Sequence, residues 1–263
     1  MKRRDFVKVG AVGSTAILIE SCNPKPTKDI QKTKTLIKSK KIQAISTWNF
    51  GLDANKVALI ELKNNGTALN AIEKGLNTTE SDASNSSVGL GGMPDENGLV
   101  TLDACIMDHE YNCGSVSFLQ NIENPISVAR KVMETTPHVM LSGKGAYDFA
   151  IKNGFAHKDL ITKESFQKWL EWKASKEQKY PEINHENHDT IAMITIDKYG
   201  HIAAGCTTSG WAYKLHGRVG DSPIIGAGVY VDPEVQIISL GSQLSKFATL
   251  RRASSTSSSA FQP

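Results

Sequence analysis

Thr190 is the residue whose surroundings best suit covalent chemistry. It opens an alternating apolar run, Thr190–Ile196, directly after a polar segment, 173–187, that is expected to be exposed. A cut before Thr190 would give this residue a free α-amine beside its own hydroxyl, so that nucleophile and general base share one residue. An α-amine has a pKa of about 7.7–8.0, against about 10.4 for lysine, so a useful fraction is neutral near pH 7. The sequence therefore suggests an N-terminal nucleophile that chain cleavage releases.

Two polar segments downstream narrow this chemistry. Together with His188-Asp189-Thr190 they resemble, in type and order, the sites of the glycosylasparaginases, members of the N-terminal-nucleophile hydrolase superfamily. The resemblance runs from about Ile42 to about Val235. The downstream segments are Thr207-Thr208-Ser209-Gly210 and Gly217-Arg218-Val219-Gly220-Asp221-Ser222-Pro223, and the upstream segments are 46–51, 91–95, 101–108, 124–130 and 136–141.

The resemblance implies catalytic roles for three residues. Thr190 Oγ would attack the carbonyl carbon of Asp189, the peptide would rearrange to an ester, and water would cleave it with help from the Asp189 side chain. The hydroxyl of Thr208 would bond and polarise Thr190. Without the resemblance, the same residues would be a strand-opening threonine, an Asx-type turn residue and a turn threonine.

Four further residues are implied to bind the substrate. The Arg218 guanidinium matches an α-carboxylate as a fork, and the Asp221 carboxylate matches an α-ammonium. An isolated arginine and aspartate at this spacing would more often bond each other and fix a loop. Trp48 and Phe50 resemble the aromatic residues near the sugar-bearing side of the substrate, although alternation on one strand is also typical of core residues.

The implied reaction is hydrolysis of a glycosylated asparagine. The neutral α-amine accepts the hydroxyl proton, Oγ attacks the side-chain amide carbon, the amino sugar leaves, and water frees aspartate from the β-aspartyl ester. No cofactor is required, and the seven histidines show no metal-ligand spacing. Isoaspartyl peptidase and L-asparaginase activity is the alternative within the same chemistry. A catalytically dead product or an exported binding protein is the alternative of another class, and a homodimer of αβ units is the implied assembly.

The resemblance ends at Val235. The family would continue with a glycine-rich segment whose Thr-Gly pair supplies the oxyanion hole. This chain continues instead with a basic, serine-rich tail, 236–263, that has no sustained period of 2 or 3.6. We interpret the change as a truncation or a shifted reading frame, with a natural disordered tail as the alternative.

Composition fits one exported domain. The 263 residues can bury a sizeable core, and 30 basic against 27 acidic residues, without a basic stripe of interleaved aromatics, argue against nucleic-acid binding. Residues 2–8 resemble a twin-arginine export signal, and the apolar stretch 9–19 is short for a membrane span. We therefore expect an export signal at 1–22, a polar tether at 23–41 and a periplasmic location. A lipid anchor at Cys22 stays open, because Glu20 is unusual in a lipoprotein cleavage box.

The pattern of elements predicts one α+β domain over 42–235. The order does not suit a Rossmann sheet, and the resemblance implies a four-layer αββα sandwich, incomplete at its C-terminal part, with an α-chain at 42–189 and a β-chain from 190. Cys105 and Cys113 either pair across a hairpin or stay free, since sequence does not fix their distance. The expected strands are 42–48, 190–196 and 201–206, and 99–107 forms a hairpin with 112–118. Helices are expected at 54–64, 68–77, 124–134 and 143–153. One further helix has a face formed by Phe166, Trp169, Leu170 and Lys173, with Trp172 off that face.

Overall fold

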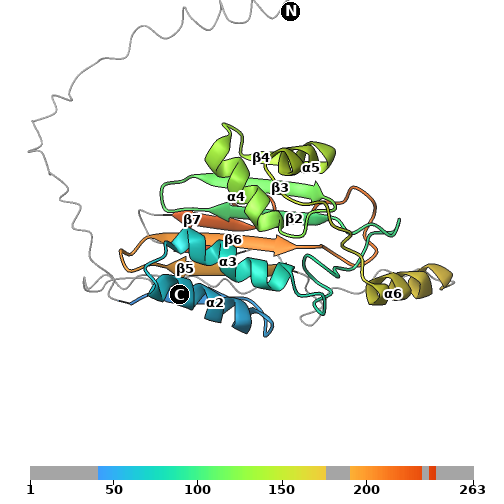
Figure 1. Cartoon of the computed structure of the whole chain (residues 1–263), viewed down its shortest axis with the longest axis horizontal. Coiled ribbons are helices and arrows are strands. Elements are labelled where there is room, and N and C mark those ends of the chain that lie inside the picture. The colour runs from blue at the N-terminus through green and yellow to red at the C-terminus, as the bar shows by residue number, and fades with distance from the viewer. Residues whose placement is uncertain (1–40, 176–189, 233–236, 241–263) are drawn as a thin grey trace, which may run out of the picture. The chain divides into compact units, whose positions relative to one another are not determined.

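The computed structural model describes residues 41–175, 190–232 and 237–240 (Figure 1). The chain divides into two units, 1–35 and 36–263, and every described residue belongs to the second unit. The expected export signal, nearly all of the tether, Asp189 and most of the tail lie outside the described residues, so these predictions stay predictions. Within the described ranges, no helix has the length and apolar character that crossing a membrane requires.

A six-stranded sheet lies at the centre of the described chain. Its strand order is β1-β5-β6-β2-β3-β4, and every neighbouring pair is antiparallel except β3 and β4. The predicted strands and the predicted hairpin are all present, whereas β4 has only three residues, too few to show a period in the sequence. The strands are β1 Gln43–Ser46, β2 Leu102–Met107, β3 Cys113–Leu119, β4 Met140–Ser142, β5 Thr190–Ile196 and β6 Ile202–Thr208.

Helices cover one face of this sheet. In Figure 1, α2, α3 and α4 lie along the near face, and side chains that alternate along β5, Ile191 and Met193, join the core beneath them. Ile72 and Leu76 of α3 are fully buried there, as their spacing predicts. The helices of the described residues are α2 Gly51–Lys63, α3 Ala68–Glu80, α4 Pro125–Thr135, α5 Gly143–Lys152 and α6 Lys163–Ala174.

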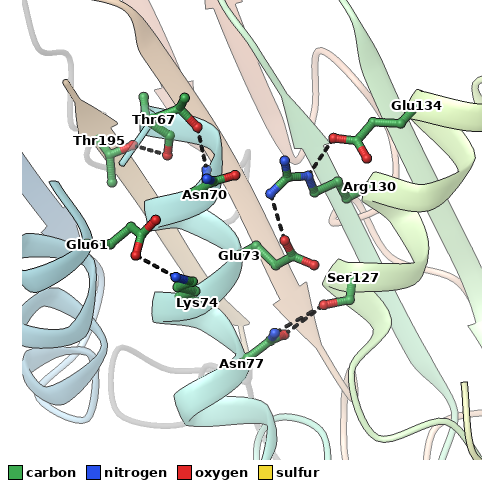
Figure 2. Close-up of polar contacts among 11 residues, drawn as sticks. Glu61, Thr67, Asn70, Glu73, Lys74, Asn77, Ser127, Arg130, Glu134 and Thr195 are labelled. Carbon is green, nitrogen blue, oxygen red and sulfur yellow. Dashed lines mark hydrogen bonds and ion pairs between the residues drawn. The ribbon is translucent and has the colours of Figure 1, made fainter. Parts of the chain in front are cut away.

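Polar contacts fix α3 between its two neighbours (Figure 2). Arg130 of α4 bonds Glu73 of α3 through Nη1 and Glu134 of its own helix through Nε, both at 2.7 Å. Lys74 of α3 forms an ion pair with Glu61 of α2. These contacts hold the helical layer in register above the sheet.

The opposite face of the sheet is covered by a second, smaller sheet. Strand β7, Val229–Asp232, pairs in antiparallel fashion with β8, Ile237–Leu240. Val229 and Val231 lie against β6 and β2 and share one buried cluster with side chains that β5 and β6 send to this face, among them Ala192, Ile194 and Cys206. The described residues therefore form three layers: helices, a six-stranded sheet and a two-stranded sheet. Strand β8 lies beyond Val235, where four residues were too few to reveal a period.

The first expected strand ends earlier than its sequence pattern suggested. Strand β1 stops at Ser46, Trp48 has a left-handed φ of 64°, and Phe50 is the helical residue that precedes α2. Gly51 allows the close turn, since a Cβ there would lie 2.2 Å from Ser46 Oγ. The prediction that Trp48 and Phe50 alternate on one strand is therefore wrong.

The start of α4 is held by a distant carboxyl group. Asn124 occupies the N-cap position, but its side chain makes no capping bond to the helix. Instead, Glu80 Oε1 accepts the Ile126 N–H at 3.0 Å and the Thr207 hydroxyl at 2.7 Å, and the Asn124 amide donates to Glu80 Oε2 at 3.3 Å. Burial raises the pKa of Glu80 to about 8, although these three hydrogen bonds act in the opposite sense.

The last helix packs differently from its predicted face. Phe166 and Leu170 are 44% and 41% exposed, so they do not form a core stripe. Trp169 donates its indole N–H to the Glu96 carbonyl at 3.3 Å, and Trp172, expected off the face, stacks on Tyr213 with ring centroids 4.6 Å apart. Helix α6 is thus attached by its tryptophans to loops and not by an apolar stripe to the core.

The three cysteines of the described residues are free thiols. Strand register pairs Cys105 with Ser115 and Cys113 with Met107, so the pairing of Cys105 with Cys113 does not occur. Cys105 instead lies directly opposite Cys206 of β6, with 3.7 Å between the two sulfur atoms.

The buried Glu80 generates a prediction about stability. Its folded-state pKa, about 8, lies above the ordinary value of 4.5, so between these values the folded chain keeps a proton that the unfolded chain has lost. The contribution of Glu80 to the free energy of unfolding therefore falls as pH rises from about 4.5 to about 8. The free energy of unfolding of Glu80→Gln, measured by urea denaturation, should equal that of the wild type at pH 4. At pH 8 it should be higher than that of the wild type by on the order of a few kcal/mol. A difference independent of pH would contradict a protonated Glu80.

Candidate active site

Three polar residues from neighbouring strands form one row at an end of the six-stranded sheet. Thr208 of β6 lies directly opposite Thr190 of β5 on one side and Asp103 of β2 on the other. Side chains that face each other across antiparallel strands point to the same face. Two positions along the same strands lie Ala192, Cys206 and Cys105, which belong to the buried cluster that includes Val229 and Val231 of β7. Because residues two apart on a strand point to the same face, the row also lies on the face that the smaller sheet covers.

Thr190 is held through its backbone and its hydroxyl. Its carbonyl oxygen accepts the indole N–H of Trp48 at 2.9 Å and the hydroxyl of Thr47 at 3.3 Å. Its Oγ1 lies 3.3 Å from the Oγ of Ser222. Trp48 therefore lies beside Thr190, as expected of a site residue. Phe50 packs instead against the hydrophobic core on the helical side.

Thr208 combines a site position with a turn-forming contact. The residue is 2% exposed, and its Oγ1 accepts the N–H of Gly210 at 2.9 Å. This bond fixes the turn at which the chain leaves β6. Thr208 is thus both opposite Thr190 in the sheet and the first anchor of the segment 209–228, which carries the predicted substrate-binding residues.

A buried lysine and a buried aspartate organise that segment. Lys214 is 2% exposed, and its ammonium group donates to the carbonyl oxygens of Ser209 at 2.9 Å and Thr101 at 3.3 Å. Burial raises the pKa of Asp103, while the positive charge of Lys214, the N–H groups of Phe118 and Gly220, and the positive charge of Arg218 lower it. Burial outweighs these contributions, so the pKa of Asp103 lies above its ordinary value, and the positive side chains of segment 209–228 offset the cost of burying its carboxylate only in part.

Arg218 lies over an aromatic ring beside two glycines. Its guanidinium carbon is 4.3 Å from the centroid of Trp211, a cation–π arrangement. A Cβ at Gly210 would lie 3.2 Å from Arg218 Nη1, and one at Gly220 would lie 3.0 Å from it. The glycines of both motifs therefore leave room for the guanidinium group.

The chain after Arg218 is bonded to the sheet. The thiol of Cys206 donates to the carbonyl oxygen of Ser222 at 3.0 Å, and the hydroxyl of Ser115 donates to the carbonyl oxygen of Pro223. The hydrogen bond with Cys105, burial and the nearby negative charge of Asp221 raise the pKa of Cys206. Asp221 and Ser222 are therefore placed over the same face as Thr190 and Thr208.

Sequence reasoning missed four residues of this site. Asp103 and Ser222 lie inside motifs that carry the resemblance, so the motifs pointed to them without giving them a role. Thr47 also lies inside such a motif, 46–51, whereas Lys214 carried no such signal, because a lysine in a loop is usually exposed. Asp189 is not among the described residues. The described ranges also contain no group of three or more histidine, cysteine or acidic residues suited to a metal ion.

Comparison with known proteins gives consistent matches. The model of the family described as asparaginase matches residues 32–241. An N(4)-(beta-N-acetylglucosaminyl)-L-asparaginase of Elizabethkingia miricola is 53% identical over 233 residues, covering 89% of this chain and 67% of the relative. The enzyme of that name from Rattus norvegicus is 39% identical and covers 72% and 63%. A probable isoaspartyl peptidase/L-asparaginase of Arabidopsis thaliana is 34% identical and covers 76% and 68%. The chain thus spans about two thirds of the length of these relatives.

The compensated charges predict strong coupling between Lys214 and Asp103. Lys214→Met should lower the free energy of unfolding by on the order of 1–3 kcal/mol, because it removes a positive charge near the buried Asp103 and the donor of two buried carbonyl oxygens. Asp103→Asn in the same chain should restore part of that loss. Lys56→Met, which removes an exposed ion pair with Asp53, should change stability by less than about 1 kcal/mol. Urea denaturation of the wild type, Lys214→Met, Asp103→Asn and the double variant measures the coupling, and additive losses at 214 and 103 would exclude it.

Proposed function

Because the chain belongs to the asparaginase family, we propose that it is an amidohydrolase of the N-terminal-nucleophile type. The proposed reaction cleaves the bond between N-acetylglucosamine and asparagine in glycoasparagines, after the chain cuts itself between Asp189 and Thr190. The observation that carries this proposal is the place of Thr190 at the start of β5. There it lies opposite Thr208 and beneath the segment that carries Arg218 and Asp221.

The proposed self-cleavage uses the hydroxyl of Thr190 as an internal nucleophile. Oγ adds to the carbonyl carbon of Asp189, the peptide C–N bond breaks, and the nitrogen becomes the free α-amine of Thr190. Water then hydrolyses the ester, which separates the two chains. The bonds from Trp48 and Thr47 to the Thr190 carbonyl support this proposal, because they hold the residue in place while the bond on its N-terminal side is exchanged.

In the proposed turnover the new α-amine is the general base. It accepts the hydroxyl proton, Oγ attacks the side-chain amide carbon of the substrate, and the proton passes to the leaving amino sugar. Water then cleaves the β-aspartyl ester and frees aspartate. Acid–base assistance of this kind accelerates a reaction by roughly 10²–10⁴-fold.

Substrate recognition is proposed for Arg218 and Asp221. The Arg218 guanidinium would take the α-carboxylate, and the Asp221 carboxylate would take the α-ammonium of the same amino-acid end. Their placement in one segment above the strand row supports this. Trp48 lies at the Thr190 carbonyl and is proposed to border the sugar-bearing side of the substrate. Phe50 packs in the helical core, which makes a supporting role more suitable for it.

The second sheet is proposed to begin with β7 and β8. In a four-layer αββα sandwich this sheet faces the first, and a further helical layer covers its outer side. The packing of β7 against β6 and β2, with Val229 and Val231 in their shared buried cluster, supports the sheet-on-sheet arrangement.

Hydrolysis of isoaspartyl peptides or free asparagine is the second candidate function. The similarity to the Arabidopsis thaliana protein, whose name carries both activities, favours it. Arg218 and Asp221 do not separate the candidates, because all of these substrates share the free amino-acid end. The group attached to the side-chain carbonyl is what differs among them.

Self-cleavage is tested directly on the full chain. The purified protein should separate into two chains, the second beginning with Thr190, and it should hydrolyse a glycoasparagine faster than a β-aspartyl dipeptide or asparagine. A folded chain that neither cuts nor hydrolyses these substrates would favour the catalytically dead product, which lacks the family's Thr-Gly pair. Thr190→Ala should stay whole and inactive, because it lacks the nucleophile, whereas Thr190→Ser should still cut. N-terminal sequencing and release of aspartate are the measurements. Cutting at another bond, or cutting by Thr190→Ala, would refute the mechanism, and faster turnover of the dipeptide would favour the second candidate.

Arg218 is tested with matched substrates. Arg218→Ala should lower kcat/KM by about 10- to 150-fold for a glycoasparagine with a free α-carboxylate, because a charged, two-pronged contact worth about 1.5–3 kcal/mol is lost. The effect should largely disappear for the α-carboxamide analogue, which the wild type already binds poorly. Arg218→Lys keeps the charge but lacks the two-pronged guanidinium group, so its kcat/KM should lie between those of the wild type and Arg218→Ala. Equal losses on both substrates would make Arg218 a structural residue.

A further inference from the structure

Ser222 places a buried hydroxyl in contact with the proposed nucleophile. Its Oγ lies 3.3 Å from Thr190 Oγ1, and the residue is 3% exposed. A hydrogen bond shielded from water is stronger electrostatically than one in solution, because the local dielectric constant is low. Ser222 is therefore positioned to affect the reactivity of Thr190.

The backbone around Ser222 is held from several sides. Cys206 donates its thiol proton to the Ser222 carbonyl, Ser115 donates to the carbonyl of Pro223, and Pro223 has a fixed φ. The close approach of Gly228 adds to this, since a Cβ there would lie 2.3 Å from the Ser222 carbonyl oxygen. Such a backbone leaves the hydroxyl little freedom to move away from Thr190. This is the preorganisation that a catalytic hydrogen bond requires.

The neighbouring Thr208 hydroxyl has a different environment. Thr208 Oγ1 accepts the Gly210 N–H and fixes the turn after β6. Ser222 reaches Thr190 from the chain that covers the sheet, whereas Thr208 lies beside Thr190 within the sheet itself. The two hydroxyls thus belong to different segments, and their effects on Thr190 are separable by substitution.

We propose that Ser222 is a further catalytic residue, which donates its O–H to Thr190 Oγ1 in the reaction proposed above. The Ser222 proton stays on Ser222 throughout. As the Thr190 proton passes to the base, negative charge grows on Oγ1 and the hydrogen bond from Ser222 strengthens. The bond then weakens as Oγ1 bonds to the amide carbon and the charge moves to the carbonyl oxygen. Because the contact exists while residue 190 is still within the chain, Ser222 assists self-cleavage in the same way.

The inference is tested by removing this hydroxyl from the full chain. Ser222→Ala should lower kcat for the glycoasparagine and the rate of self-cleavage, each by about 10- to 100-fold, and leave KM within twofold. Ser222→Cys, which keeps a weaker donor, should lie between the wild type and Ser222→Ala. Ser117→Ala is the matched control, because it removes an equally buried serine hydroxyl that bonds Ser142 of β4, and its rates should stay within twofold of the wild type.

The outcomes separate this inference from the function on which it rests. If the wild type cuts before Thr190 and turns over glycoasparagine while Ser222→Ala retains kcat within twofold, the Ser222 inference is wrong and the proposed function stands. A loss that appears only in KM, or one that Ser117→Ala shares, assigns Ser222 to substrate binding or to folding and also overturns the inference. A wild type that neither cuts before Thr190 nor hydrolyses the substrates overturns both. If Ser222→Ala does not fold, as shown by circular dichroism, Ser222→Cys with kcat equal to that of the wild type gives the negative answer.

Discussion

The antiparallel pairing of β5, β6 and β2 is the constraint on which the site depends. These strands come from two distant parts of the chain, β2 and the consecutive strands β5 and β6, and their register sets Thr190, Thr208 and Asp103 side by side. Because strand side chains alternate with a period of two, a slip of one residue would turn the shifted residue to the opposite face. The apolar side chains farther along these strands resist such a slip, because it would move them too from one face of the sheet to the other.

Strand β6 connects two buried polar networks on opposite faces of the sheet. Thr208 faces the candidate site, and the preceding Thr207 faces the helices, where its hydroxyl bonds Glu80. Glu80 in turn holds the start of α4. Each face thus carries a buried carboxyl group whose pKa is raised by burial, Glu80 on one and Asp103 on the other, and the positive charges of Lys214 and Arg218 partly oppose the shift of Asp103. The end of β6 is fixed by polar contacts from both sides.

This arrangement gives the site rigid supports beneath a covering loop. The strand row is built on paired backbone, and the segment 209–228 is bonded to it through Lys214, Cys206 and Ser115. A nucleophile gains from such support, because a productive geometry must be held within a few tenths of an ångström during bond formation. The proposed roles of Arg218, Asp221 and Ser222 all require that this segment keep its place over the sheet.

The sequence by itself determined the strand that begins at Thr190, the hairpin of β2 and β3, most helices and the family, because these follow from local periodicity, turn residues and ordered motifs. Only the tertiary structure decided which residues meet. Ser222 contacts Thr190 across 32 positions, Cys105 meets Cys206 and not Cys113, and Trp48 leaves its expected strand to bond the Thr190 carbonyl. Such contacts depend on strand order and register, which combine segments that lie from 32 to 142 residues apart. No local pattern encodes that combination.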